Sequence, residues 1–191
     1  MINTPDLSLL NEWQLKRDAS AFQELVTRHS AMVFSTCRRI VQNTTDAEEV
    51  SQECFIALAQ ADAKKIRILG GWLHSMATSR SLNRLRADKR RILREKRFVE
   101  INPSHVEPTW DDIQCFVDEA IETLPEELSS LVIAHFLEGE TQAILAESLA
   151  LSPSAVSRRM NRAVEQIRAH LKSRGIIVAL ALLPGLLAEA S

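Results

Sequence analysis

Apolar residues recur along this chain at intervals of three and four, the spacing of helices with one buried face. In the first half of the chain the pattern predicts helices over residues 7–16, 19–40, 46–60 and 72–97. In the second half it predicts helices over residues 112–123, 126–137, 141–149 and 153–171. No segment alternates apolar and polar residues convincingly enough for a strand. We therefore expect an all-α fold.

Residues 98–111 contain Pro103 and Pro108 and show no periodicity, which is typical of a linker. The expected organisation is two small helical domains, 1–97 and 112–174, joined by a flexible linker over 98–111 and followed by an apolar tail over 175–191. The apolar part of the tail, 176–188, is too short for a bilayer span of about 20 residues. Two interpretations stay open: it packs on one of the domains or a regulator and covers a binding face, or it completes the second core.

Composition narrows the function classes. The three cysteines, Cys37, Cys54 and Cys115, are odd in number and have no metal-ligand spacing, which indicates reduced thiols in a cytoplasmic protein. No histidine pair suggests a metal site, and His29 lies on the apolar stripe of its helix as a core histidine would. The N-terminus carries no recognisable export signal. We expect neither a metal nor another cofactor.

Charge is strongly segregated although the net charge is only −2. Residues 64–97 hold twelve Lys or Arg against two acidic residues, and residues 98–157 hold twelve Asp or Glu and no Lys or Arg. Residues 158–174 return to six basic residues against one acidic residue. Two basic segments separated by an acidic one indicate two contacts with a polyanion.

The helix over 46–60 has one apolar and one acidic face. Ala47, Val50 and Cys54 fall on the apolar side, whereas Glu49 and its neighbours Gln52 and Glu53 fall on the opposite side. Thr45 or Asp46 is the expected N-cap. A merely solvated face is an equal alternative from these residues alone.

Residues 141–171 have the layout of a helix-turn-helix, whose second helix enters the major groove of DNA. A short helix is followed by the turn Ala150-Leu151-Ser152, and Ser152 caps a helix begun by Pro153. Arginine and asparagine pair with guanine and adenine edges. The residues predicted to face DNA are Ser154, Ser157, Arg158, Asn161 and Arg162.

The helix over 72–97 begins with an apolar cluster around Trp72, which we expect to be a core residue, and continues as an arginine-rich segment. So dense a positive charge repels itself unless a polyanion lies against it. Asn83 is the uncharged amide of this segment and the candidate base reader.

The order of these parts resembles a bacterial sigma factor of the extracytoplasmic-function group, the compact members of the sigma-70 family. The segment 46–55 looks like the family's segment 2.2, which grips the clamp helices of core RNA polymerase. The segment 72–86 looks like those that recognise and open the −10 promoter element. The segment 124–163 looks like region 4, which reads the −35 element as duplex. Ser79 and Asn83 depart from the family's usual asparagine and aspartate, and Ala150 from its usual glycine.

The resemblance implies a factor without catalytic activity of its own that binds core RNA polymerase and directs promoter-specific transcription initiation. The polymerase-binding residues that it implies are Asp46, Glu48, Glu49, Gln52 and Glu53. The −10 residues that it implies are Arg80, Asn83, Arg84, Arg86, Lys89 and Arg90, with the loop 61–71 receiving an extruded base. The −35 residues are those of the helix-turn-helix. The implied partners are core RNA polymerase and promoter DNA, without a membrane span, and an anti-sigma factor is left open.

A second function class stays open: a helix-turn-helix regulator that binds DNA without polymerase, usually as a dimer on a palindrome. Such a protein would not need the acidic face. An enzyme finds almost no support, because the sequence shows no nucleophile–base pairing, glycine-rich phosphate loop or metal-ligand spacing.

Overall fold

The computed structural model describes residues 5–96, 110–174 and 176, with side chains except in 89–96 and 110–115. Its first half contains the helices α1 (Asp6–Lys16), α2 (Ala19–Val41), α3 (Thr44–Gln60) and α4 (Leu69–Lys96), with a short 3-10 helix η1 (Ala63–Lys65) before α4. Its second half contains α5 (Trp110–Glu122), α6 (Glu126–Val132), the π-helical turn η2 (Ile133–Leu137), α7 (Gln142–Ser148) and α8 (Pro153–Ser173). The described residues contain no β-strand. The all-α prediction is confirmed.

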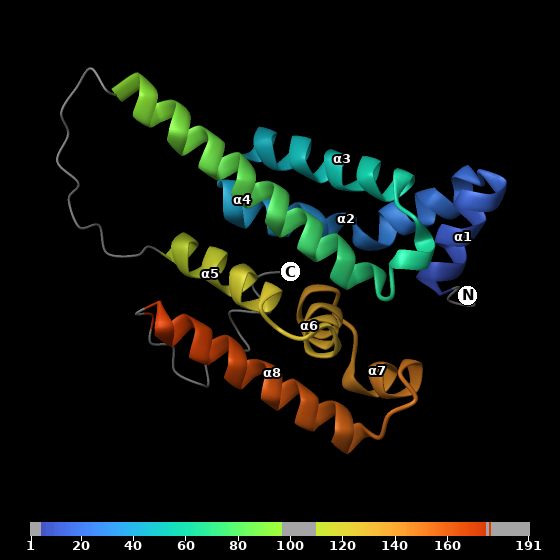
Figure 1. Ribbon diagram of the computed structural model, residues 1–191. Helices are drawn as coiled ribbons and strands as arrows, with labels where there is room; N and C mark the ends of the chain where they lie inside the picture. The colour runs from blue at the N-terminus through green and yellow to red at the C-terminus, as the bar shows by residue number, and fades with distance from the viewer. Residues whose placement is uncertain (1–4, 97–109, 175, 177–191) are drawn as a thin grey trace.

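Helix α2 is the centre of the first half, where α1, α3 and α4 pack around it (Figure 1). Its predicted apolar stripe is buried, with Leu25, Val33 and Cys37 fully inaccessible to solvent. Val50 and Cys54 of α3 are buried opposite this stripe, as the 3.6-residue period requires. Cys37 and Cys54 are free thiols, and the side chain of Cys115 lies outside the described residues.

Two local predictions in the first half are wrong. Helix α3 is capped by Asn43, whose side chain accepts the N–H of Asp46, rather than by Thr45 or Asp46. Asparagine is an equally strong cap, and Asn43 stands two residues before Thr45 and three before Asp46. The loop predicted over 61–71 ends earlier, because α4 begins at Leu69 and takes Gly70 and the glycine after it into its first turn.

The second half is built on α5, α6 and α8, and α7 covers one end of α8. The predicted helix over 126–137 exists, but its last turn widens to a π-helix at Ile133–Leu137. Gly139 follows with φ of 74°, in the left-handed region that glycine adopts without strain. This turn sends the chain into the helix-turn-helix.

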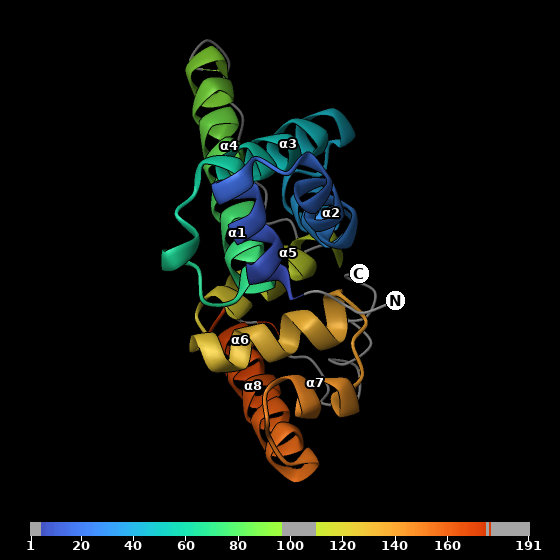
Figure 2. The same cartoon turned by 90° about the vertical axis from the view of Figure 1, so that its right-hand side faces the viewer.

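The two halves are packed against each other. Helix α5 contacts α2 and α4, and α6 contacts α4 (Figures 1 and 2). Helix α3 lies on the far side of the first half, and α7 and α8 lie on the far side of the second (Figure 2). The predicted domain boundaries remain predictions, since 97–109 and 177–191 lie outside the described residues and with them most of the linker and the tail. Ile176 is described: it is buried, and its N–H donates to the Leu171 carbonyl.

No helix among the described residues is long and apolar enough to cross a membrane.

Candidate functional site

The acidic residues predicted on α3 lie at its surface, and the helix itself lies on the side of the first half that is remote from the second half (Figures 1 and 2). Glu48, Glu49 and Gln52 are exposed, and Asp46 and Glu53 are half-buried. Because the apolar residues of α3 are buried against α2, the helix cannot rotate without uncovering its core contacts. The face is therefore held in one orientation.

The structure brings two of the predicted −10 arginines onto the same acidic face. Arg84 Nη2 lies 2.6 Å from Asp46 Oδ1 and 2.9 Å from Glu49 Oε2. Arg80 Nη1 lies 2.6 Å from Glu53 Oε2. The family resemblance assigned these residues to two separate sites, and the packing of α3 against α4 brings them together.

The remaining −10 residues continue along α4. Asn83 and Arg86 are exposed, and the Arg86 guanidinium donates to Asn83 Oδ1 across 3.5 Å. Lys89 and Arg90 belong to the same helix, but their side chains lie outside the described residues. Among the described side chains, this surface of α4 therefore exposes the positive charge of Arg86 and the amide of Asn83.

The helix-turn-helix is formed as predicted. Thr141 accepts the N–H of Ile144 at the start of α7, and Ser152 accepts the N–H of Ala155 at the start of α8. Ala150 between them has φ of 51°, the left-handed region where glycine is favoured. The alanine is therefore strained in a turn of otherwise ordinary geometry.

Helix α8 presents its predicted DNA-facing residues outward. Ser154, Arg158, Asn161 and Arg162 are exposed, and Ser157 is half-buried. The opposite face is buried in the core of the second half through Val156, Met160, Ala163, Ile167 and Leu171. Sequence reasoning passed over Arg159, which is half-buried and lies 3.8 Å from Glu127 of α6.

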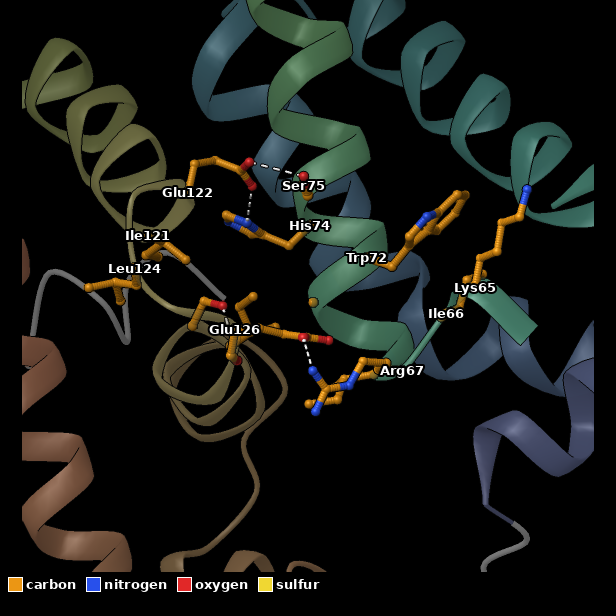
Figure 3. Close-up of a pocket in the computed structure, with 14 residues that line it drawn as sticks. Lys65, Ile66, Arg67, Trp72, His74, Ser75, Ile121, Glu122, Leu124 and Glu126 are labelled. Atoms are coloured by element: carbon orange, nitrogen blue, oxygen red, sulfur yellow. Dashed lines mark hydrogen bonds and ion pairs between the residues drawn. The ribbon is translucent and has the colours of Figure 1, made fainter. Parts of the chain in front are cut away.

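A cavity of about 270 Å³ lies where the loop before α4 meets the second half (Figure 3). Arg67 and Trp72 line it from the first half, and Glu122 and Glu126 line it from the second. Arg67 Nη1 lies 3.0 Å from Glu126 Oε2, and the Ser75 hydroxyl donates to Glu122 Oε2 across 3.0 Å. This loop is the segment predicted to receive an extruded base.

A buried ionic cluster joins the halves behind this cavity. Arg39 of α2 donates to both carboxylate oxygens of Asp118 of α5, at 2.8 Å and 3.0 Å. His74 of α4 lies 3.1 Å from Asp118 Oδ1 and 3.5 Å from Glu122 Oε1. Burial favours neutral His74 and Asp118, but their partners outweigh it, raising the pKa of His74 and lowering the pKa of Asp118. The partners therefore favour the charged form of both groups.

A second cluster joins the halves at His29 of α2. Its Nδ1 lies 2.7 Å from Glu138 Oε1 at the end of η2, and its Nε2 lies 2.9 Å from Asp6 Oδ2 of α1. Burial alone would lower the pKa of His29, but hydrogen bonds to Asp6 and Glu138 raise it to about 9. The expectation of a satisfied core histidine is confirmed, and the bridge to the second half was not predicted.

Within the described residues, no group of three or more His, Cys, Asp or Glu could hold a metal ion. The His29 and His74 clusters are ion pairs between side chains and not ligand sets.

Two protein-family models match this chain. The model of sigma-70 region 2 matches residues 25–91, and that of sigma-70 region 4 matches residues 117–167. The extracytoplasmic-function RNA polymerase sigma factor SigK of Mycolicibacterium vanbaalenii is 24% identical over 174 residues, covering 86% of this chain and 89% of SigK. The corresponding sigma factor SigW of Bacillus subtilis is 23% identical over 172 residues, covering 82% and 92%. A solved structure of CnrH in complex with the cytosolic domain of CnrY is 21% identical, covers 88% of this chain and 97% of that chain, and has a TM-score of 0.39.

Proposed function

This chain belongs to the extracytoplasmic-function group of the sigma-70 family and directs transcription initiation at promoters, and we propose which of its surfaces carry that function. The exposed acidic face of α3 docks on the clamp helices of core RNA polymerase. The basic surface of α4 with the loop 61–71 binds the −10 element, and the outer face of α8 reads the −35 element. The protein acts in the cytoplasm, has no catalytic activity of its own and needs no cofactor.

One observation carries this assignment. The matched regions 2 and 4 coincide with the two halves of the structure, and each half exposes the polar face that its predicted partner requires. On α3 the exposed residues include Glu48 and Glu49, which suit a basic partner helix, and electrostatic complementarity of this kind speeds and orients association. On the N-terminal half of α8 they include Ser154, Arg158 and Asn161, which suit base edges and phosphates.

The test is a pull-down of core RNA polymerase with the full chain. Glu48 is the best residue to change, because it is exposed and lies outside the ion pairs that Glu49 and Glu53 make with α4. We expect Glu48→Lys to weaken core binding about tenfold at low salt. The control is Glu24→Lys at an exposed position of α2, which reverses the same charge on another helix and in addition breaks the pair with Arg28. Equal binding by both variants and the unaltered chain would refute the docking surface.

The rival function, a regulator that binds DNA without polymerase, predicts that the chain shifts a promoter fragment equally well with and without core enzyme. The proposed function instead predicts promoter-specific transcripts only when this chain and the core enzyme are both present.

A further inference from the structure

Helix α1 lies beside the segment that joins α3 to α4, where the proposed −10-binding loop 61–71 begins (Figures 1 and 2). The C-cap of α3, Ala61, has extended backbone angles, with φ of −70° and ψ of 149°. The end of α3 is therefore not closed by a left-handed residue, which in many helices satisfies the last carbonyls. The Ala61 N–H donates to the Leu58 carbonyl, so the carbonyls that follow Leu58 still need donors.

Two neighbouring side chains of α1 supply such donors. Trp13 Nε1 donates to the Ala59 carbonyl across 3.1 Å. The Gln14 side-chain amide donates to the Ala61 carbonyl, and its Oε1 accepts the N–H of Ala63 across 3.2 Å. Because a glutamine amide offers both a donor and an acceptor, one side chain pairs with two backbone groups and holds the first residues of the loop.

The side chain of Trp13 is itself held in place by its neighbours. Its ring packs on Phe22 of α2 with the centroids 4.9 Å apart, and the Arg17 guanidinium lies 5.3 Å from the Trp13 ring centroid. Trp13 and Gln14 are both half-buried. Their acceptors at the end of α3 lie 46 and 47 positions further along the sequence. The loop is therefore anchored to α1 as well as to the two helices that it connects.

The loop that is anchored in this way presents positive charge to solvent. Ala63 and Ile66 are buried, whereas Lys64, Lys65 and Arg67 are exposed. Exposed cations of this kind suit DNA phosphates, but phosphate contacts carry no sequence information by themselves. Recognition of one base needs its contacts held to within about 0.5 Å, and a loop that is already ordered loses less conformational entropy on binding. The anchor on α1 meets this requirement.

We propose that Trp13 and Gln14 are positioning residues for promoter recognition, which hold the backbone of residues 59–63 so that the loop meets the extruded −10 base in a conformation already formed. Each acts through the loop rather than by contacting the base itself. A loop released from α1 would keep its three cations but would lose its fixed backbone, so discrimination between bases would fall more than affinity for DNA. This inference rests on the proposed function of the loop 61–71.

The test removes the hydrogen bonds and keeps the packing. Gln14→Met has a side chain of similar length without an amide, and Trp13→Phe keeps a ring beside Phe22 but lacks the Nε1–H. The matched control is Leu15→Met, which introduces methionine at the next position of α1, where the side chain is 83% exposed. Hydrogen exchange of the amides of residues 61–66 measures the release of the loop. Transcription with core enzyme from a promoter selected with the unaltered chain, and from copies with each −10 or −35 base replaced in turn, measures discrimination.

In both variants we expect the loop amides to exchange about fivefold faster and discrimination at one or more −10 positions to fall about fivefold, the order of magnitude that a net hydrogen bond contributes. Discrimination at the −35 positions and binding to core enzyme should stay within about twofold of the unaltered chain, less than one such hydrogen bond. Every measurement on Leu15→Met should stay within the same range. Either variant is sufficient if the other does not fold.

Faster exchange with unchanged −10 discrimination would overturn the proposal, because recognition would then not depend on the anchor. Unchanged exchange would overturn it as well, since the loop would hold its conformation without these bonds. An equal loss at the −10 and −35 positions would also overturn it, because it indicates general destabilisation. An unaltered chain without preference at any −10 position would instead refute the proposed function of the loop.

Discussion

Raising the pH should weaken the cluster of His29 with Asp6 and Glu138, because His29 carries its charge only while protonated. The charged groups that face it are Asp6 and Arg28 from the first half, with Glu138 and Glu140 from the second. Hydrogen bonds to the two nearest carboxylates overcome burial and raise the pKa of His29 from 6.5 to about 9. A group with a raised pKa in the folded state stabilises that state fully below its unfolded pKa and loses this contribution as the pH passes the folded pKa.

The size of the effect follows from the same rise. One pKa unit corresponds to 1.36 kcal/mol, so a rise from 6.5 to about 9 is worth on the order of 3 kcal/mol of folding free energy. Most of this contribution is still present at pH 7, and almost none remains at pH 10. Since whole domains are stable by only about 5–15 kcal/mol, a loss of this size is measurable.

The assay is urea unfolding of the unaltered chain and of His29→Gln at pH 7 and pH 10, followed by tryptophan fluorescence. Other groups also titrate over this range, but they affect both proteins, so the difference between the two isolates His29. We expect His29→Gln to be less stable by roughly 2–3 kcal/mol at pH 7 and by much less at pH 10. A difference that is the same at both pH values would refute a protonated His29 in the folded chain.

Three further predictions concern the turn, the recognition helix and the buried pair. Ala150→Gly should raise the free energy of unfolding by about 1 kcal/mol, because φ of 51° strains alanine and not glycine; thermal denaturation checks this, and a lowered stability contradicts it. Arg158→Ala and Asn161→Ala should each cost about 1–3 kcal/mol in binding a cognate −35 duplex and relax specificity at one position, as competition with altered duplexes would show. Asp118→Asn should cost about 3–5 kcal/mol of folding free energy, because it leaves Arg39 buried without its counter-charge; a loss below 1 kcal/mol in urea unfolding would show that Arg39 finds another partner.

Helix positions and buried faces could be predicted from the sequence because both follow from local periodicity. The stripe through Val50 and Cys54 on α3 is buried as predicted, and the apolar residues Val156, Met160 and Ile167, which recur at helical spacing on α8, are buried as well. The turn before α8 was equally readable, since a serine cap followed by proline is a local signal. Prediction and structure agree on these features because each depends only on residues within about two helical turns of each other.

The errors have a different origin. Two adjacent glycines usually mark a loop, yet Gly70 and its neighbour lie in the first turn of α4. A Cβ at Gly70 would lie 2.9 Å from Glu138 Oε1 of the second half, so close packing accounts for a glycine at this position. His29 was expected to be satisfied in the core, but its partner Glu138 lies 109 positions away in the sequence. The apolar periodicity of one helix carries no information about an ion-pair partner so far away in the sequence. Long-range ion pairs become visible only once the tertiary packing is known.

Burial decides which of the ion pairs in this chain can exchange partners when polymerase or DNA arrives. The Arg84 side chain is 36% exposed and that of Glu49 is 55% exposed, and exposed pairs of this kind contribute about 0–1 kcal/mol. Arg84 can therefore exchange Glu49 for a DNA phosphate, and Glu49 can exchange Arg84 for a basic helix of polymerase, at little cost. The pair does not conflict with the proposed DNA-binding role of Arg84 or the proposed polymerase-binding role of Glu49. The pair of Arg39 and Asp118 is 7% and 1% exposed, so the loss of either partner would leave the other charge buried and uncompensated. The ion pairs on the surfaces proposed to bind partners can therefore exchange at little cost, whereas the buried pair between the halves cannot exchange its partner while the halves stay packed.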